Sequence, residues 1–115
     1  MLDWIKLNSL DQLDHIVAES SSTPTVIFKH STRCSISSIA KMRLEDRWDF
    51  TADELKAYYL DLISYRAISN AVADRFAVHH ESPQLLLIRN GECTYEASHL
   101  DISVEELKEC FEDIA

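Results

Sequence analysis

The chain has 115 residues and a formal net charge of −9, from 11 basic and 20 acidic side chains. This length predicts one domain, spanning residues 1–115, with a single core. The acidic balance argues against non-specific binding to nucleic acid, which requires clustered lysines and arginines. The apolar runs fall far short of a membrane span, so we expect neither a membrane partner nor an export signal.

The cysteines, Cys34, Cys93 and Cys110, are odd in number and widely spaced. This pattern is not that of a disulfide framework. Because we also expect no export signal, the cysteine pattern predicts a protein of the reducing cytoplasm.

The beginning of the chain predicts a helix. Residues 4–7 before it form either a short strand or a cap on the core. Ser9 and Gln12 have the spacing of a capping box that opens the helix, and Pro24 ends it by disfavouring helical geometry at the preceding residue. The residues on its inward face are Leu10, Leu13, Ile16 and Val17.

The middle of the chain predicts a strand, a helix and a second strand. Residues 25–29 are β-branched and aromatic, as in a strand, and residues 57–63 form a nearly continuous apolar run typical of a buried strand. The helix between them begins after Cys34, and Thr51 and Glu54 form a second capping box for a short turn. The core-facing residues of this helix are Ile36, Ile39, Ala40, Leu44 and Trp48.

The end of the chain predicts a β-hairpin followed by a helix. Residues 84–89 and 92–97 are its strands, and Asn90 with Gly91 between them is a strong signal for a two-residue turn. A third capping box, which begins at Ser103, opens the final helix. The inward residues of that helix are Val104, Leu107, Phe111 and Ile114.

With a further helix over residues 66–77, the order of elements is α β α β α β β α. A strand–helix–strand unit implies parallel pairing, and the hairpin implies an antiparallel pair. The sequence therefore predicts an α/β fold with a mixed four- to five-stranded sheet and helices on both faces.

The strand-to-helix junction at Cys34 is the strongest candidate for chemistry. The first amides of a helix have no partner within the helix, and the helix dipole adds about half a positive charge there. Both favour the thiolate, which is the reactive form of cysteine. Basic residues also gather between positions 29 and 47, so this region should attract a small anionic partner. For the basic residues within the helix, a solvated helix face is an equal alternative.

Cys34 and Ser37 have the spacing of a Cys-x-x-Cys redox pair in which serine replaces the second cysteine. They lie one helical turn apart on the same face. The serine cannot form a disulfide; its hydroxyl either donates a hydrogen bond to the sulfur or serves only the first turn of the helix. The thiol would therefore work alone and keep half of a disulfide until an outside thiol resolves it.

Ser82-Pro83, just before a buried strand, is a candidate cis peptide bond. The motif alone is weak evidence, because only about 5–6% of X-Pro bonds are cis. It gains weight from its context. A strand–Cys–helix unit followed by a Pro–strand–hairpin–helix unit is the layout of thioredoxin.

Three segments carry a family resemblance: residues 29–37 (Lys-His-Ser-Thr-Arg-Cys-Ser-Ile-Ser), 65–70 (Tyr-Arg-Ala-Ile-Ser-Asn) and 80–84 (His-Glu-Ser-Pro-Gln). With them the chain resembles, over nearly its whole length, the YtxJ family of monothiol bacilliredoxin-like proteins, which carries a general-stress label. The resemblance implies a thioredoxin-like fold with a cis-proline. It also implies the removal of bacillithiol from bacillithiolated proteins.

By this resemblance Cys34 is the nucleophile and Ser37 fills the resolving position. The implied substrate-binding residues are Lys29, Arg33, Ser82 and Pro83, of which the last two lie against the sulfur. Bacillithiol carries a malate, whose carboxylates would suit a basic rim of Lys29 and Arg33. We expect no tightly bound cofactor, with bacillithiol or another small thiol as co-substrate and bacillithiolated proteins as partners.

Two functions of other classes stay open. One is a non-catalytic thioredoxin-fold adaptor of the stress response. The other is an iron–sulfur carrier like the monothiol glutaredoxins, which is disfavoured because Ser35 and Ile36 stand where those proteins have Gly and Phe. We interpret Cys93 and Cys110 as packing thiols. His79, His80 and Glu81 lack a third ligand at short spacing, so we expect no metal site there.

Overall fold

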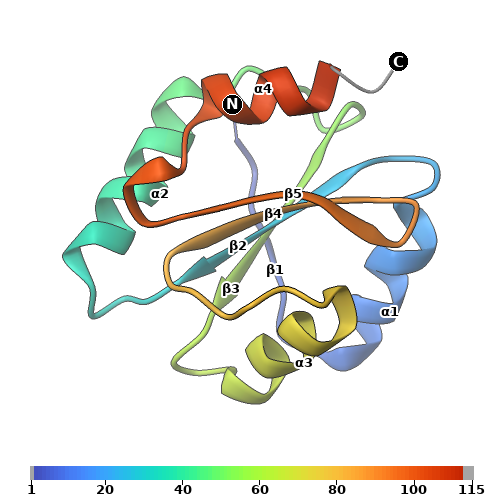
Figure 1. Cartoon of the computed structure of the whole chain (residues 1–115), viewed down its shortest axis with the longest axis horizontal. Coiled ribbons are helices and arrows are strands. Elements are labelled where there is room, and N and C mark those ends of the chain that lie inside the picture. Colours follow the sequence, from blue (N-terminus) through green and yellow to red (C-terminus); the bar gives the residue numbers. More distant parts are fainter. Residues whose placement is uncertain (1, 113–115) are drawn as a thin grey trace.

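The computed structural model describes residues 2–112 and shows a mixed five-stranded sheet with helices packed on both faces (Figure 1). The strands lie in the order β1-β3-β2-β4-β5. β1, β3 and β2 are parallel to one another, whereas β4 is antiparallel to β2 and to β5, as predicted. The elements are β1 Ile5–Lys6, α1 Leu10–Glu19, β2 Thr25–His30, α2 Ser35–Arg47, β3 Lys56–Asp61, α3 Arg66–Phe76, β4 Gln84–Arg89, β5 Glu92–Ser98, the 3₁₀ helix η1 His99–Asp101 and α4 Val104–Glu112.

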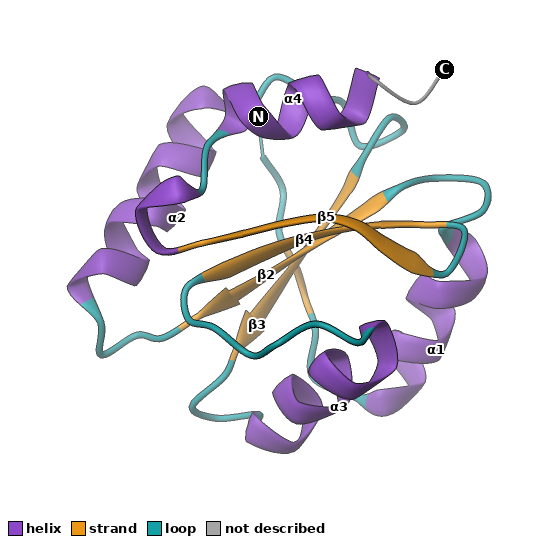
Figure 2. Cartoon of the chain, in the orientation of Figure 1, coloured by secondary structure: helices purple, strands orange, loops and turns teal. Residues whose placement is uncertain are grey.

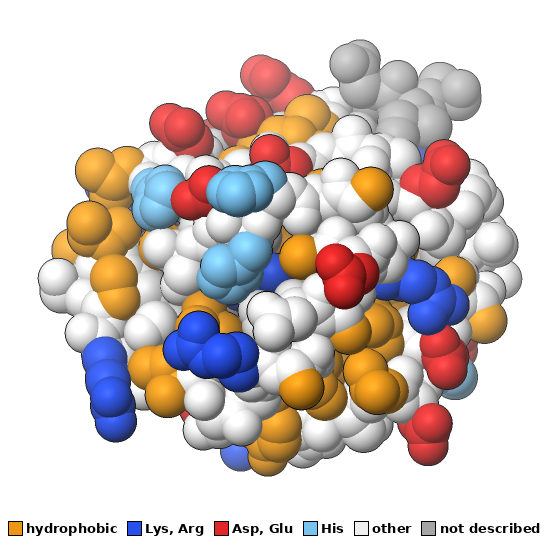
Figure 3. All heavy atoms as spheres, turned by 60° about the horizontal axis from the view of Figure 1, so that its bottom comes forward, with side chains coloured by type: hydrophobic (Ala, Val, Ile, Leu, Met, Phe, Trp, Pro, Cys, Tyr) orange, Lys and Arg blue, Asp and Glu red, His pale blue; other side chains and the backbone are white. Residues whose placement is uncertain are grey.

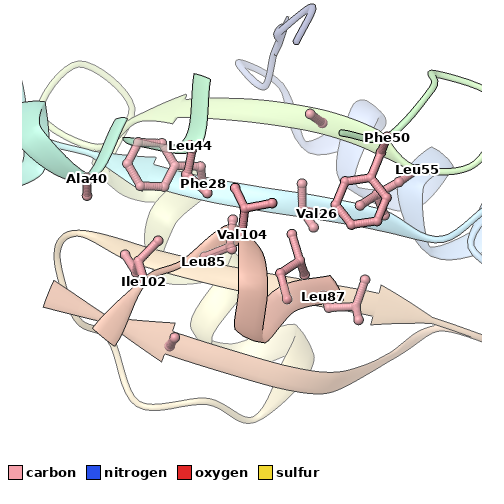
Figure 4. Close-up of a cluster of buried hydrophobic side chains, with 13 residues drawn as sticks. Val26, Phe28, Ala40, Leu44, Phe50, Leu55, Leu85, Leu87, Ile102 and Val104 are labelled. Carbon is pink, nitrogen blue, oxygen red and sulfur yellow. The ribbon is translucent and has the colours of Figure 1, made fainter. Parts of the chain in front are cut away.

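The helices form two layers that enclose the sheet. Figure 2 shows α2 and α4 on one side of the strands and α1 and α3 on the other. Alternate residues of the central strand β2 enter the two cores, because side chains of a strand point to opposite faces in turn. Val26 and Phe28 pack with α2 and α4 (Figure 4), and Ile27 packs with α1 and α3. All residues of β2 are buried.

The hairpin turn is hydrogen-bonded to the residue that follows α1, Ser20. Asn90 and Gly91 have φ angles of 51° and 76°, the left-handed values that a two-residue hairpin turn requires and that glycine adopts at little cost. The Gly91 N–H donates to Ser20 Oγ at 2.8 Å, and the Asn90 N–H donates to the Ser20 carbonyl at 3.1 Å. The predicted turn is confirmed.

The capping boxes are borne out to different extents. Ser9 and Gln12 bond reciprocally at the start of α1, and Thr51 and Glu54 do so in a turn that does not become a helix. At α4 the Ser103 hydroxyl accepts from the N–H of residue 106, whose carboxylate accepts instead from the hydroxyl of Tyr95.

The predicted inward face of α2 is wrong in part. Ala40 and Leu44 are buried, but Ile36 and Ile39 are 40% and 41% exposed. The buried stripe is instead Ser37, Ala40 and Leu44, which turns the apolar residues outward. Figure 3 shows hydrophobic side chains gathered at the left edge of the molecule, the side on which α2 lies.

Two smaller corrections concern the other helices. Leu10 is exposed, because at the first position of α1 it precedes the turns that contact the core, whereas Leu13 and Ile16 are buried. In α4 Val104 and Leu107 are buried as predicted and Phe111 is partly buried. Ile114 lies outside the described residues.

Candidate active site

Cys34 lies in the loop that connects β2 to α2. It is the N-cap residue of α2, with extended backbone angles (φ −114°, ψ 120°), and its side chain makes no capping hydrogen bond. Its N–H donates to the Ser31 carbonyl at 3.2 Å, and its own carbonyl accepts from the Ser38 N–H at 3.1 Å. The thiol is half-buried. It therefore stands beside the unpaired first amides of a helix, the end that favours negative charge.

The loop before β4 lies next to the same end of β2. Lys29 pairs with Gln84 across the two antiparallel strands, so Ser82 and Pro83 precede β4 at the edge of the sheet where β2 ends. The Ser82–Pro83 peptide bond is cis. The loop is anchored by the amide of Gln84, which donates to the His79 carbonyl at 3.0 Å.

Ser82 presents an unused hydrogen-bonding group at this edge. Its hydroxyl oxygen is buried and has no hydrogen-bond partner among the described residues. A buried hydroxyl is normally paired. Ser82 therefore has a hydroxyl donor to spare for a ligand.

Ser37, in the resolving position, is fully buried. Its hydroxyl oxygen lies 2.7 Å from His30 Nδ1 and accepts the Ser31 N–H at 3.0 Å. The hydrogen bonds of this hydroxyl thus run to the end of β2 and not to the sulfur of Cys34. Of the alternatives left open by the sequence, the structure favours a local structural role for Ser37.

Lys29 does not form part of an exposed basic rim, so that prediction is wrong. Its side chain is fully buried, because β2 alternation places it on the same face as Ile27. The amine donates to the Ser69 carbonyl at 3.1 Å and lies 3.1 Å from His80 Nδ1. Burial lowers the pKa of Lys29 to about 8. Arg33, in contrast, is exposed beside Cys34.

The Lys29–His80 contact is the feature of this region that the sequence analysis missed. It links β2 directly to the loop that carries the cis-proline. Burial, followed by the charge of Lys29, lowers the pKa of His80, which favours a neutral ring that accepts from the ammonium. The alternating pattern of β2 was the available signal, since it places a lysine in line with Ile27.

Cys93 fits the interpretation as a packing thiol. It packs against the core on the α1 and α3 side, and its thiol donates to the Tyr95 carbonyl at 3.3 Å. Burial raises the pKa of Cys93 to about 11. Cys110 is half-buried in α4.

Within residues 2–112, no three His, Cys, Asp or Glu side chains converge as they would around a metal ion. None of the helices in that range is both long and apolar enough to cross a bilayer.

Comparison with known proteins identifies the family. The sequence profile described as monothiol bacilliredoxin BrxC matches residues 5–107 of this chain. The chain belongs to the monothiol bacilliredoxin family. This confirms the resemblance seen in the sequence, and the matched region contains Cys34 and Cys93.

Solved structures agree with this assignment. One described as an oxidoreductase with a thioredoxin fold is 33% identical over 92% of this chain and 91% of its own, with a TM-score of 0.77. Thioredoxins from Malassezia sympodialis and Trypanosoma brucei brucei are 17% and 15% identical, cover 98% and 97% of this chain and 91% and 90% of their own, and have TM-scores of 0.75 and 0.76. The thioredoxins establish the fold, and the bacilliredoxin family and the oxidoreductase relative support a thiol redox function.

Proposed function

We propose that this protein is a monothiol thiol–disulfide oxidoreductase that removes bacillithiol from protein mixed disulfides. The observation that carries the proposal is the position of Cys34, a half-buried thiol at the N-terminus of α2 with a buried serine one turn further on. Membership of the monothiol bacilliredoxin family supports the choice of bacillithiol.

The reaction proceeds by exchange of one disulfide for another. The Cys34 thiolate attacks the bacillithiol sulfur of the mixed disulfide, and a new bond forms between the two sulfurs as the old S–S bond breaks. The electron pair of the broken bond leaves with the protein sulfur, which takes up a proton. Cys34 then holds bacillithiol until a second small thiol attacks and releases it as a disulfide.

The surrounding residues take separate roles in this proposal. Arg33 is the exposed cation nearest in sequence to Cys34, and it attracts the carboxylates of bacillithiol. The free hydroxyl of Ser82 donates a hydrogen bond to the bound sulfur or ligand. Pro83 shapes the loop, whereas Ser37 and Lys29 position the backbone from within the protein.

The test is the intact mass of the protein after incubation with a bacillithiolated substrate. We expect one bacillithiol adduct, absent in Cys34→Ser and retained in Cys93→Ser and Cys110→Ser. Release of the adduct by added bacillithiol would complete the cycle. An adduct that persists without Cys34 would refute the assignment, and a protein that takes up no adduct would favour the non-catalytic adaptor.

A further inference from the structure

A cavity of about 460 Å³ opens beside the active-site edge of the sheet. It lies at the carboxyl ends of β1 and β3, where Lys6 and Asp61 are the last strand residues, and Lys41 of α2 and Tyr65 before α3 close its sides. The crevice at the carboxyl ends of parallel strands is where open α/β sheets bind ligands. The role assigned to Cys34 does not use this cavity.

The walls of the cavity are aromatic and held in place. Trp4 stacks on Phe28 with ring centroids 5.6 Å apart and meets Tyr59 edge-on at 6.1 Å. Tyr65 adds a third ring and is 39% exposed. Rigid aromatic faces of this kind suit the body of a small organic molecule.

The cavity lining carries two cations, Lys6 and Lys41, and one carboxylate, Asp61. Lys41 forms an ion pair with Glu45 at 2.8 Å. The Asp61 carboxylate accepts hydrogen bonds from backbone N–H groups of the next turn, including that of Ile63 at 3.2 Å. Lys6 is exposed and forms no ion pair with an acid of the described chain. Of the two cations in the lining, Lys6 thus remains available to a carboxylate of a ligand, and Asp61 is turned toward the N–H groups of its own turn.

The cavity is within reach of a ligand attached to Cys34. Lys41 follows Cys34 by two helical turns, which places both on the same side of α2, about 10 Å apart along the axis. The ring of Tyr59, in the cavity floor, contacts His30 at 5.5 Å between centroids, and His30 in turn contacts Ser37. Buried side chains therefore connect the floor of the cavity to the first turn of α2 from beneath.

We infer that this cavity holds the non-sulfur part of a small anionic thiol while its sulfur is bonded to Cys34. The inference rests on the proposed function and names a binding site for its co-substrate. A carboxylate of the ligand pairs with Lys6, and its organic body lies against Tyr65 and Trp4. The pocket then selects small thiols that carry both a carboxylate and enough bulk to fill it.

The experiment uses bacillithiol methylated on sulfur, which cannot form a disulfide. Calorimetric titration should show saturable binding to the wild-type protein. Lys6→Met and Tyr65→Ala should each raise the dissociation constant by roughly fivefold, the effect of losing one exposed contact of this kind. Lys108→Met is the matched control, because Lys108 pairs with Asp49 at 2.7 Å and neither lines the cavity.

Failure of S-methyl bacillithiol to bind the wild type would overturn the inference, and so would Lys6→Met and Tyr65→Ala variants that bind it as tightly as the wild type does. The adduct on Cys34, measured by intact mass in the same proteins, tests the proposed function separately. If Cys34 forms the adduct but the two variants bind as tightly as wild type, the proposed function is supported and the binding role of the cavity is refuted. If binding depends on Lys6 but Cys34 forms no adduct, the binding role of the cavity is supported and the proposed function is refuted.

Discussion

The Ser37 hydroxyl lies 2.7 Å from Nδ1 of His30, beneath the first turn of α2. Burial, and after it the charge of Lys41, lowers the pKa of His30, so the neutral ring is favoured and shares a hydrogen bond with the serine hydroxyl. The oxygen of the same hydroxyl accepts the Ser31 N–H. The serine that replaces a resolving cysteine therefore ties the end of β2 to the start of α2.

Replacing Ser37 by alanine should destabilise the fold, because it leaves the Ser31 N–H and the His30 ring without their buried partner. Such unpaired groups cost about 1–3 kcal/mol, to be measured as the free energy of unfolding in urea. Ser38→Ala, at an exposed position on the same helix, should change that energy by less than about 0.5 kcal/mol. Equal effects of the two substitutions on the unfolding free energy would contradict a stabilising link between β2 and α2 through the Ser37 hydroxyl.

The architecture could be predicted because each element carries a local signal. The capping box at Ser9 and the turn at Asn90-Gly91 fix ends of elements by bonds between near neighbours. The apolar runs of β2 and β4 read as buried strands because both lie in the interior of the sheet. Such signals need no knowledge of distant parts of the chain.

The side-chain positions at the site could not be predicted in the same way. Ile36 faces outward and Ser37 inward because a partner from β2, His30, satisfies the serine hydroxyl. Lys29 is buried because α3 and the loop before β4 supply the Ser69 carbonyl and His80. These partners come from elsewhere in the chain, and hydrophobicity alone assigns the opposite faces.

Lys29 should make stability depend on pH in alkaline solution. Its pKa is about 8 in the folded protein against an ordinary value near 10.4, so between these values the unfolded chain binds more protons and stability rises with pH. Lys29→Met removes the titrating group. We therefore expect the stability of the variant relative to wild type to fall as pH rises from 8 to 10, as followed by urea unfolding.

Lys56→Met is the control for this experiment. Lys56 is partly exposed and pairs with Glu19 at 2.9 Å, and that hydrogen bond raises the pKa of Lys56. Its contribution is present below the ordinary lysine pKa and is lost only above it. The difference between Lys56→Met and wild type should thus stay constant from pH 8 to 10. If the difference in unfolding free energy between Lys29→Met and wild type also stays constant, the conclusion that Lys29 is buried without a compensating charge would be contradicted.

Cys93 should resist alkylation in the folded protein. Because burial raises its pKa to about 11, its thiolate is scarce at pH 8, and the thiolate is the species that reacts. Treatment with iodoacetamide at that pH should modify Cys34 well before Cys93, as measured by peptide mass spectrometry. In guanidinium chloride Cys93 should react freely. Rapid modification of Cys93 without denaturant would show that it is more accessible than the packing implies.

Arg33 should set the rate at which anionic mixed disulfides reach Cys34. It is exposed and directly precedes the nucleophile, so its charge acts on the approaching carboxylates over a short distance. Arg33→Gln should slow the reaction with a bacillithiolated peptide roughly two- to fivefold at low salt, the range for one exposed charge. The deficit should shrink as added salt screens the interaction.

Arg43→Gln removes the same charge from a more distant position on the exposed surface of α2, beside the pocket formed with Leu100 and Ser103. The reaction rate of this variant should stay close to that of wild type. Both substitutions change the net charge equally. A local effect at Arg33 should therefore slow only the Arg33→Gln variant, whereas a general effect of net charge should slow both variants alike. Equal rates for the two variants would remove Arg33 from the substrate-binding set, which would leave the recognition of bacillithiol to Ser82 and to the cavity lined by Lys6.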